Sequence, residues 1–497
     1  MSHASKRPFS LDDDEVAGVR AAFDAAGFDE TGVAALCGAS SIATLKDVPG
    51  ELALARTAGG RPLDVLTRLF VIGAPHSAAQ ARAALAPLPL DRWVAGGLLR
   101  VVRDEVVGAV KMTPYDGLLL AFDRGTEDGE AADHVMGPSD SARRLANLTP
   151  RRPCEDSLDL GTGCGLLALL LARHSQRVVA TDVNPRAVAF TELNARLSGV
   201  SNLTALCGDL FAPVAGRRFD LVVSNPPFVI SPEDRLVYLT GGMKADAFCQ
   251  RVAAEAPSVL ADDGWCQMLC NWVELEGDEW SDRLRSWFEG SGCDTWVLRS
   301  STTDPASYAR AWIAVGSGAA EAADPARLAA WLRYYEEERI GAIGGGVVTM
   351  RKRAGKNWFR AFDAPQRAVG PAWEAVVERM PALGFLDAAA DDAALMASVL
   401  AVSPDVRLVQ ECRPTKEGWA QETARVRVVR GLAYEEEVDT YFGELIVACD
   451  GRRTLAEAME HTAARLGQAV EDAPAETAAI VRQLVEEGFL GPCEPVG

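Results

Sequence analysis

The sequence lacks any apolar run that approaches the roughly 20 residues a helix needs to cross a bilayer. Its first residues, MSHASKRPFSLDDDE, contain no apolar core of the kind found in a secretion signal. We therefore expect a cytoplasmic protein without membrane contact. Positively charged residues are fewer than negatively charged ones: the chain has 50 Lys and Arg residues and 70 Asp and Glu residues, so its net charge is −20. This balance argues against phosphate binding over the whole surface, which depends on Lys and Arg.

Metal-binding patterns are missing as well. The 11 cysteines include no Cys-x-x-Cys pair, and no cysteine cluster lies near a histidine at the spacing of metal ligands. Cys266 and Cys270 fall inside an apolar, strand-like run, where small buried thiols are expected. We therefore predict no metal site, and no disulfide in a reducing cytoplasm.

The chain of 497 residues is longer than one hydrophobic core usually supports, and its pattern separates into three regions. Residues 1–145 have helical periodicity and end in a helix followed by two short β-rich pieces. This order predicts a helical, winged-helix-like N-terminal domain that serves as a nucleic-acid reader, a partner surface or a structural cap. Residues 356–497 begin loop-like and end in two amphipathic helical segments, which predicts a mostly helical C-terminal accessory domain.

The middle region, residues 146–355, alternates short apolar strands with helices. Such alternation predicts parallel strands joined by right-handed crossovers, hence a doubly wound, Rossmann-like α/β sheet. We expect seven strands, at residues 157–161, 177–182, 203–209, 219–225, 265–272, 295–300 and 345–353.

A glycine-rich loop follows the first of these strands. It reads Asp159-Leu-Gly161-Thr162-Gly163-Cys-Gly165 and precedes a long apolar helix. Glycines let the backbone turn tightly and approach a ligand closely. The loop lies where open α/β sheets bind ligands, at the carboxyl end of a parallel strand. Alone it is weak evidence, because many nucleotide-binding folds use such a loop.

Three further strand ends carry suggestive residues. Asp182 and Val183 end the second strand, Asp209-Leu210-Phe211 ends the third, and Asn225-Pro226-Pro227-Phe228 ends the fourth. A carboxylate after the second strand can accept hydrogen bonds from both hydroxyls of a ribose. Asp209 is placed to bind an adenine amino group, with Phe211 able to pack on the ring.

Taken together, these motifs resemble the class I S-adenosylmethionine-dependent methyltransferases, and among them the small methyltransferase group with its Asn-Pro-Pro-aromatic motif. The resemblance covers roughly residues 130–355. It implies S-adenosylmethionine as the cofactor, with the glycine loop at its methionine part. The residues that it implies in cofactor binding are Asp159, Gly161, Thr162, Gly163, Gly165, Asp182, Val183, Asp209, Leu210 and Asn225. Val135 to Ser139 are further pocket candidates, and His134 is either a catalytic base or a hydrogen-bonded structural residue.

The segment Asn225 to Phe228 also indicates which atom accepts the methyl group. An amide or aromatic amine nitrogen is a poor nucleophile because its lone pair is delocalised. The Asn225 side-chain oxygen and the Pro226 carbonyl can accept both N–H bonds of such a group, and Phe228 can stack on it. We therefore predict a catalytic segment of Asn225, Pro226, Pro227 and Phe228 that works by positioning and electrostatics.

Two subfamilies match this motif order. Release-factor glutamine methyltransferases share the phrases GDLF and FDLVVSNPP, and ribosomal RNA guanine-N2 methyltransferases more often share the phenylalanine. Our leading interpretation is therefore a protein glutamine substrate, such as a translation factor, which the acidic balance favours. The alternatives are the exocyclic amine of a nucleobase in RNA (guanine-N2 or adenine-N6), a small-molecule amine, and a non-catalytic binding scaffold.

The chain also departs from both subfamilies. Residues 302–342, with an expected helix in DPARLAAWLRYYEEERIG, replace a short hairpin, and Tyr308, Trp312 and Trp331 there either shape the pocket or pack in the core. The C-terminal region has no counterpart in either subfamily. As a whole the chain resembles long actinobacterial methyltransferases with extra terminal domains. The basic-aromatic segment 351–360 either contacts RNA or is a strand end that runs into a solvated loop.

Overall fold

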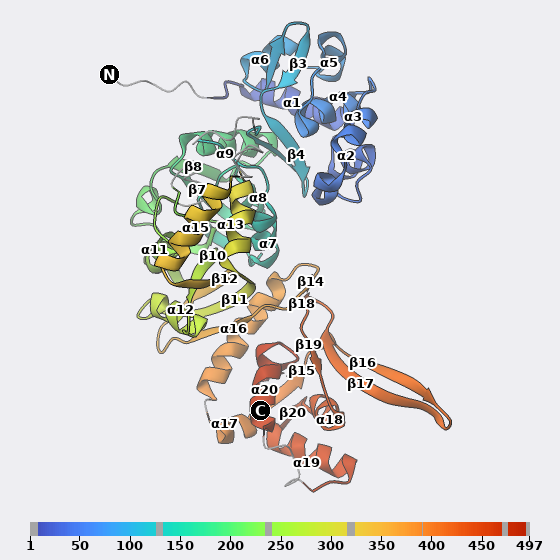
Figure 1. The fold of residues 1–497 in the computed structure, drawn as a ribbon, viewed down its shortest axis with the longest axis vertical. Coiled ribbons are helices and arrows are strands. Elements are labelled where there is room, and N and C mark those ends of the chain that lie inside the picture. Colours follow the sequence, from blue (N-terminus) through green and yellow to red (C-terminus); the bar gives the residue numbers. More distant parts are fainter. Residues whose placement is uncertain are drawn as a thin grey trace. The chain divides into compact units, whose positions relative to one another are not determined.

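The computed structural model describes residues 8–125, 133–233, 241–315, 324–389, 391–469 and 476–493. The chain divides into two compact units, and Figure 1 shows its elements in sequence colours. The first unit comprises Met1–Arg143, Arg152–Asp282 and Thr303–Gly344. The second comprises Arg144–Arg151, Arg283–Thr302 and Gly345–Gly497.

The first unit begins with a helical region. Its α-helices are α1 (Asp13–Ala26), α2 (Glu30–Cys37), α3 (Gly50–Arg56), α4 (Pro62–Leu66), α5 (Ala78–Ala84) and α6 (Leu90–Ala95). Helix α1 starts at a capping box between Asp12 and Glu15 and ends at Gly27, whose φ of 66° is left-handed. Three short strands follow in the order β1-β3-β2, and then comes a separate hairpin. These strands are β1 (His76–Ser77), β2 (Leu99–Val102), β3 (Glu105–Gly108), β4 (Lys111–Tyr115) and β5 (Leu118–Phe122).

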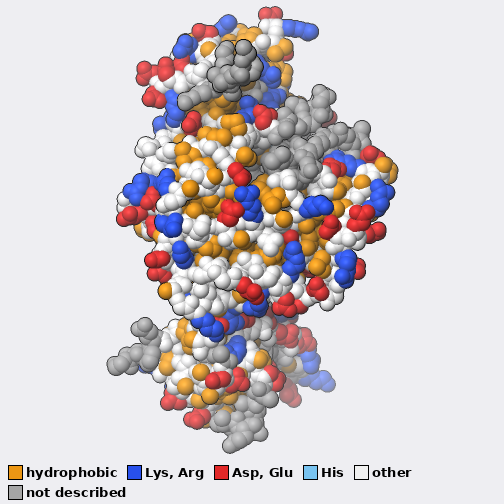
Figure 2. Space-filling model, turned by 90° about the vertical axis from the view of Figure 1, so that its left-hand side faces the viewer, with side chains coloured by type: hydrophobic (Ala, Val, Ile, Leu, Met, Phe, Trp, Pro, Cys, Tyr) orange, Lys and Arg blue, Asp and Glu red, His pale blue; other side chains and the backbone are white. Residues whose placement is uncertain are grey.

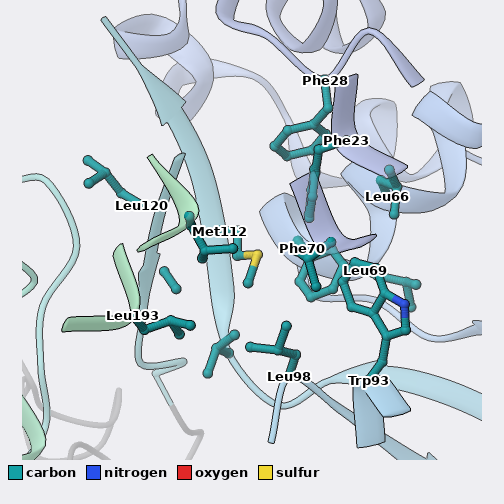
Figure 3. Packing of buried hydrophobic residues seen from close by; sticks show 14 of the residues in the cluster. Phe23, Phe28, Leu66, Leu69, Phe70, Trp93, Leu98, Met112, Leu120 and Leu193 are labelled. Carbon is teal, nitrogen blue, oxygen red and sulfur yellow. The ribbon is translucent and has the colours of Figure 1, made fainter. Parts of the chain in front are cut away.

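Helix α6 followed by the β2–β3 hairpin is the helix-and-hairpin order that the sequence predicts. An aromatic cluster fills this region, with Phe23 4.6 Å from Phe28 and 5.5 Å from Phe70 between ring centroids. Figure 3 shows Met112 and Leu120 of the β4–β5 hairpin beside this cluster, with Leu193 of α9 (Pro185–Leu197) near them. One continuous core therefore joins the N-terminal helices to the first α/β crossovers.

The central sheet has the order β13-β11-β12-β10-β9-β6-β7-β8. Its strands are β6 (Cys154–Leu160), β7 (Ser175–Asp182), β8 (Leu203–Cys207), β9 (Phe219–Ser224), β10 (Leu260–Leu275), β11 (Cys293–Thr303), β12 (Ile340–Lys352) and β13 (Phe359–Asp363). Strands β10, β9, β6, β7 and β8 pair in parallel, as do β11 and β13. Helix α7 (Asp140–Leu148) precedes the first of these strands, and the helices between them include α8 (Leu166–Leu171), α9, α11 (Ala247–Glu255) and α12 (Trp280–Phe288). The predicted doubly wound α/β class is thus confirmed.

The strand count differs from the prediction of seven, because β13 adds an eighth strand along β11. The sequence predicts no strand here, and β13 begins within the basic-aromatic segment 351–360. Each of its residues is half-buried or exposed, so its sequence lacks the apolar run of a central strand. It lies beyond residue 355, where the sequence places the end of the α/β region.

The expected helix between the sixth and seventh strands is present as α15 (Pro325–Glu337), and α13 (Pro305–Ala314) precedes it. Both start with Pro at the first turn after an Asp cap, Asp304 for α13 and Asp324 for α15. Their buried side chains join one apolar cluster with Val229 and Ile230, which follow the Asn225–Phe228 segment. This inserted pair therefore packs directly against the chain that leaves the fourth strand.

The C-terminal part of the second unit mixes helices and strands. Its helices are α16 (Trp373–Ala388), α17 (Asp392–Met396), α18 (Thr440–Ala448), α19 (Leu455–Leu466) and α20 (Thr477–Glu486). Its strands are β14 (Ala368–Val369), β15 (Val399–Val402), β16 (Val406–Thr415), β17 (Gly418–Val428), β18 (Gly431–Leu432), β19 (Glu435–Glu437), β20 (Asp450–Thr454) and β21 (Leu490–Pro492). The predicted capping box between Thr454 and Glu457 is present at the start of α19.

This region holds more strand than the mostly helical domain that we predicted, and between β13 and α16 it is loop-like except for β14. Helix α16 forms in spite of Pro381 because Val376, Met380 and Leu383 are buried at helical spacing. The β16–β17 hairpin escaped prediction because most of its residues are exposed, so they show no sustained apolar alternation.

Among the described helices, none is both long and apolar enough to cross a membrane. Within the same residues no group of three or more His, Cys, Asp or Glu side chains is arranged to hold a metal ion.

Candidate functional site

The predicted site residues meet at one edge of the sheet. Strands β9, β6, β7 and β8 are parallel neighbours in this order. Leu160 at the end of β6 pairs with Thr181 on one side and with Ser224 on the other. The glycine loop, Asp182 and Asn225 therefore leave adjacent strand ends, as the sequence predicts, and Asp209 follows the next strand.

The glycine loop folds over the end of β7. The N–H groups of Gly161 and Thr162 donate to the Thr181 carbonyl, with N···O distances of 2.8 and 3.0 Å. Gly161, Gly163 and Gly165 have left-handed φ values of 75°, 55° and 84°. A Cβ at Gly165 would lie 3.0 Å from the Thr191 hydroxyl of α9, whereas one at Gly161 or Gly163 would meet no atom within 4 Å. Gly165 thus permits helix packing, while the other two glycines border open space that a ligand can occupy.

Asp159 is fully buried beneath this loop. Its Oδ2 accepts hydrogen bonds from the Thr162 hydroxyl at 2.7 Å and from the Ala168 N–H at 3.0 Å. Its Oδ1 is buried and has no hydrogen-bond partner among the described residues. Burial raises the pKa of this carboxyl to about 7, and the two hydrogen bonds oppose the rise. A donor or cation at Oδ1 would complete the site.

Asp182 closes the loop from the other side. Its Oδ2 accepts the Gly163 N–H and its Oδ1 accepts the Asn184 N–H, both at 2.9 Å. Burial raises its pKa, and these backbone hydrogen bonds act in the opposite direction. Each carboxylate oxygen keeps a further lone pair for a ligand hydroxyl. The next residue, Val183, exposes 60% of its surface, so it offers an apolar face beside this acid.

Asp209 lies nearer the surface than expected for a ligand acid. Its side chain is 62% exposed and pairs with Arg251 of α11 at 3.2 Å. Leu210 is buried in a left-handed conformation, with φ of 42°. Phe211 is 6% exposed, so its ring is packed inside the protein. The packing of Phe211 on a ligand ring stays a prediction, and of these two apolar side chains only that of Val183 is exposed.

Asn225 carries an unused acceptor. Its Nδ2 donates to the Ser141 hydroxyl at 3.3 Å. Its Oδ1 is buried and lacks a hydrogen-bond partner within the described part of the chain. A buried carbonyl without a partner is costly, so this oxygen is an acceptor that a ligand N–H group could satisfy. Pro226 is buried and Phe228 is half-buried, with its ring 5.9 Å from that of Trp312 in an edge-on arrangement.

Two tyrosines of the inserted helices hold the chain just after Phe228. The Ile230 N–H donates to the Tyr308 hydroxyl at 3.2 Å, and the Tyr335 hydroxyl donates to the Ile230 carbonyl at 2.9 Å. Asn271 donates to Tyr308 at 2.8 Å. These buried bonds fix the direction of the strand end that carries Asn225.

Glu233 provides a second anchor for the same segment. Arg327 of α15 donates to both of its carboxylate oxygens at 2.6 Å, and Trp331 Nε1 donates to Oε1 at 2.8 Å. Tyr308 and Trp331 are buried and thus pack in the core, one of the two roles left open for them, whereas Trp312 is half-buried beside Phe228. The sequence did not point to Ser141, Tyr335, Arg327 or Glu233, because each acts through a partner far away in the chain.

The segment before the first strand lies over the start of α9. The Val135 N–H donates to Asp123 at 3.0 Å, and Asn184 Nδ2 donates to the Asp133 carbonyl at 2.9 Å. His134 and Val135 are buried. The same segment leads to Ser141, so it reaches the side chain of Asn225.

The basic-aromatic segment 351–360 is engaged within the second unit. Arg353 forms two bonds with Asp294, at 2.6 and 3.1 Å, and Arg360 pairs with Glu486 at 2.5 Å. Lys356 lies 3.5 Å from Asp387, and Trp358 is buried. Arg353, Arg360 and Trp358 are therefore built into the fold, whereas the Lys356 side chain is 84% exposed. Figure 2 shows Lys and Arg side chains interspersed with Asp and Glu on the face that it draws.

Three models of protein families match parts of this chain. Residues 140–274 match the model of the methyltransferase small domain. Two further models, both described as domains of unknown function, match residues 25–109 and 356–492.

The curated relatives carry glutamine methyltransferase names. The release factor glutamine methyltransferase of Aquifex aeolicus is 39% identical over 119 residues, which span 22% of this chain and 42% of the relative. That of Geobacter sulfurreducens is 36% identical over 188 residues, with 34% and 64% covered. A putative protein N5-glutamine methyltransferase of Methanocaldococcus jannaschii is 34% identical over 137 residues, with 26% and 68% covered. The chain thus spans between 42% and 68% of the length of these relatives.

The fold and its strand-end residues are those of a class I S-adenosylmethionine-dependent methyltransferase. Within this class the chain belongs to the small methyltransferase group, whose model covers the glycine loop, Asp182, Asp209 and Asn225.

Proposed function

We propose that this chain is an S-adenosylmethionine-dependent N-methyltransferase that acts on the side-chain amide of a glutamine in a protein substrate, such as a translation factor. The observation that carries the proposal is the buried Asn225 Oδ1 without a partner in the described residues, at the strand end beside the glycine loop. We assign catalysis to residues 146–355 and place the protein in the cytoplasm.

The residues at the strand ends fit S-adenosylmethionine. Asp159 Oδ1 is a buried acceptor that needs a donor, and the open sides of Gly161 and Gly163 leave room for one. Asp182 would take the ribose hydroxyls, since both of its oxygens are fixed by backbone N–H groups. Val183 offers its exposed face to the base. When bound, this cofactor supplies an electrophilic methyl group.

Asn225 and the Pro226 carbonyl would prepare the acceptor nitrogen. An amide nitrogen shares its lone pair with its own carbonyl, so it attacks poorly. Two acceptors that hold its N–H bonds increase the electron density on nitrogen and fix the direction of the lone pair. The Ser141 hydroxyl holds the Asn225 amide by its Nδ2, which leaves Oδ1 for the substrate. Phe228 would flank the planar amide, with Trp312 behind it.

The names of the relatives support a protein glutamine over a nucleobase amine. The structure lowers the support for RNA, because Arg353 and Arg360 are paired with acids and Trp358 is buried. The net charge of −20 points in the same direction.

The test is Asn225→Ala, measured for cofactor affinity by calorimetry and for turnover with labelled S-adenosylmethionine. We expect nearly unchanged affinity and turnover lowered at least about a hundredfold, through lost hydrogen bonding in the transition state. The matched control is Asn202→Ala, because Asn202 bonds the Ala172 and Ser175 carbonyls at the opposite end of β7. Near-normal turnover by Asn225→Ala would refute the activation of the acceptor nitrogen by Asn225. If the wild-type chain binds the cofactor but transfers no methyl group to any cell fraction, it is a binding scaffold.

A further inference from the structure

The strand β16 forms an open edge of a small sheet. This sheet has the order β16-β17-β19, so within the described residues β16 has a neighbouring strand on one side only. All 10 residues of β16 are exposed or half-buried, and Leu408 exposes 53% of its surface. Figure 1 shows the β16–β17 hairpin extending away from helices α18 to α20 of the same unit. A long uncovered edge strand is a template for pairing with another chain.

The pairing of β17 shows which residues of β16 direct their backbone N–H and C=O groups to the open edge. The Ala424 carbonyl accepts the Val438 N–H at 2.9 Å, on the side of β19. Ala424 therefore directs its backbone away from β16, and the pair Gln410–Ala424 is a non-hydrogen-bonded one. By alternation, Leu408, Gln410 and Cys412 direct their N–H and C=O groups to the open edge.

The order of charges along β16 is complementary to itself. If two copies pair antiparallel about Val409, Arg407 of one copy faces Glu411 of the other. This pair occurs twice because of the two-fold symmetry. A register centred on Gln410 instead places Arg407 opposite Arg413, which cross-strand repulsion disfavours, and one centred on Leu408 forms no pair of opposite charges within β16.

The same register also satisfies the backbone. Leu408 of each copy exchanges two backbone hydrogen bonds with Gln410 of the other copy. The Cys412 N–H of each copy donates to the Val406 carbonyl of the other, so the interface has about six backbone hydrogen bonds. The Val406 N–H is already bound to the Ser403 carbonyl at 3.1 Å. Pro414 has no N–H group, so β16 presents no donor to the open edge beyond Cys412.

The paired side chains keep capacity for these contacts. Glu411 accepts one bond from the Thr423 hydroxyl at 3.1 Å, and Arg407 Nη1 donates to the Pro404 and Val406 carbonyls, both at 2.8 Å. A carboxylate accepts about four hydrogen bonds and a guanidinium donates five. Each group can therefore hold its present partners and a further one across the new edge.

We propose that β16 is the self-association surface of this protein, where two copies pair antiparallel about Val409 to continue one sheet across the dimer. This inference is independent of the methyl acceptor. It concerns the C-terminal unit, whereas the methyl-transfer site is built on the strand ends of the first unit.

A cysteine cross-link tests the register in the full-length chain. In a Cys412→Ser background, Val409→Cys places two thiols opposite each other at the two-fold axis. The Cβ atoms of such a non-hydrogen-bonded pair lie about 4.5 Å apart, close to the span of a disulfide. Oxidation with glutathione disulfide should give a covalent dimer. The matched control is Gln410→Cys in the same background, which faces Leu408 of the second copy and should remain uncoupled.

Sedimentation of charge variants tests the pairing without cross-linking. Arg407→Glu should weaken dimerisation about tenfold or more, because it puts two glutamates opposite each other, and adding Glu411→Arg should restore it. A wild-type chain that sediments as a monomer at all concentrations overturns the proposal. Equal cross-linking of Val409→Cys and Gln410→Cys, or no rescue by the double variant, overturns it as well.

Discussion

Tyr335 offers a sharp perturbation of the acceptor segment, because its hydroxyl reaches a single backbone atom. Its Oη donates to the Ile230 carbonyl at 2.9 Å, and both residues are almost fully buried, with 1% and 0% of their surface exposed. Tyr335→Phe removes one oxygen and leaves the ring in place. The Ile230 carbonyl then loses its donor in a site from which water is excluded.

The expected magnitude follows from the cost of an unpaired buried carbonyl, which is about 1–3 kcal/mol. The segment can recover part of this cost by shifting, and such a shift moves Asn225 away from the position that the acceptor requires. Because each 1.4 kcal/mol corresponds to a factor of about ten in rate, we expect kcat to fall about tenfold. Cofactor affinity should stay within about twofold, since Tyr335 bonds the acceptor segment and no residue of the glycine loop.

The matched control is the neighbouring Tyr334→Phe. The Tyr334 hydroxyl accepts the Ala245 N–H at 3.0 Å, so this variant loses a similar bond outside the segment from Asn225 to Glu233. Both variants are compared by thermal melting, calorimetric cofactor affinity and steady-state kinetics, well below the melting temperature. The reasoning fails if Tyr335→Phe keeps its kcat, or if Tyr334→Phe lowers kcat by the same factor.

Three other predictions concern the cofactor side. Asp182→Ala should weaken S-adenosylmethionine binding in calorimetry, since the ribose hydroxyls and the Gly163 N–H lose a charged partner; unchanged affinity would remove Asp182 from the site. Gly163→Ala and Gly216→Ala both place a Cβ atom at a residue with positive φ and with no other atom within 4 Å. Both variants should therefore lower the free energy of unfolding by about 1 kcal/mol, but only Gly163→Ala should reduce cofactor affinity. Burial raises the pKa of Asp159 from 3.8 to about 7, so the folded state keeps a proton that the unfolded chain releases. Urea unfolding of the cofactor-free protein should therefore show stability falling between about pH 4 and 7, and Asp159→Asn should reduce this fall; parallel pH curves would contradict the assignment.

The α/β class and the candidate site could be predicted because both depend on local patterns. Alternating apolar strands and helices indicate a parallel sheet, and parallel strands bring Asp159, Asp182, Asp209 and Asn225 to one edge. The sequence could not show that Asp209 is engaged by Arg251 or that Phe211 is packed inside, because both depend on side-chain positions.

Contacts between residues far apart in the chain could not be predicted, because local patterns do not show side-chain positions. Tyr335 and Ile230 are separated by 105 positions, and nothing in either local pattern links them. Strand β13 and the β16–β17 hairpin lack the buried alternation that marks a strand in sequence. The pairing of Arg353 and Arg360 with acids changed the interpretation of a basic segment that looked open to RNA.

The most direct test of the central claim is methyl transfer from radioactive S-adenosylmethionine, by the purified full-length chain, into an extract of the cells from which the chain comes. We predict label that resists ribonuclease, is removed by protease, and is released by acid hydrolysis of the protein fraction as methylamine, which becomes volatile when the hydrolysate is made alkaline, as an N-methylated glutamine side chain requires. Label that is lost with ribonuclease, or that appears in the acid-soluble fraction, would contradict this prediction.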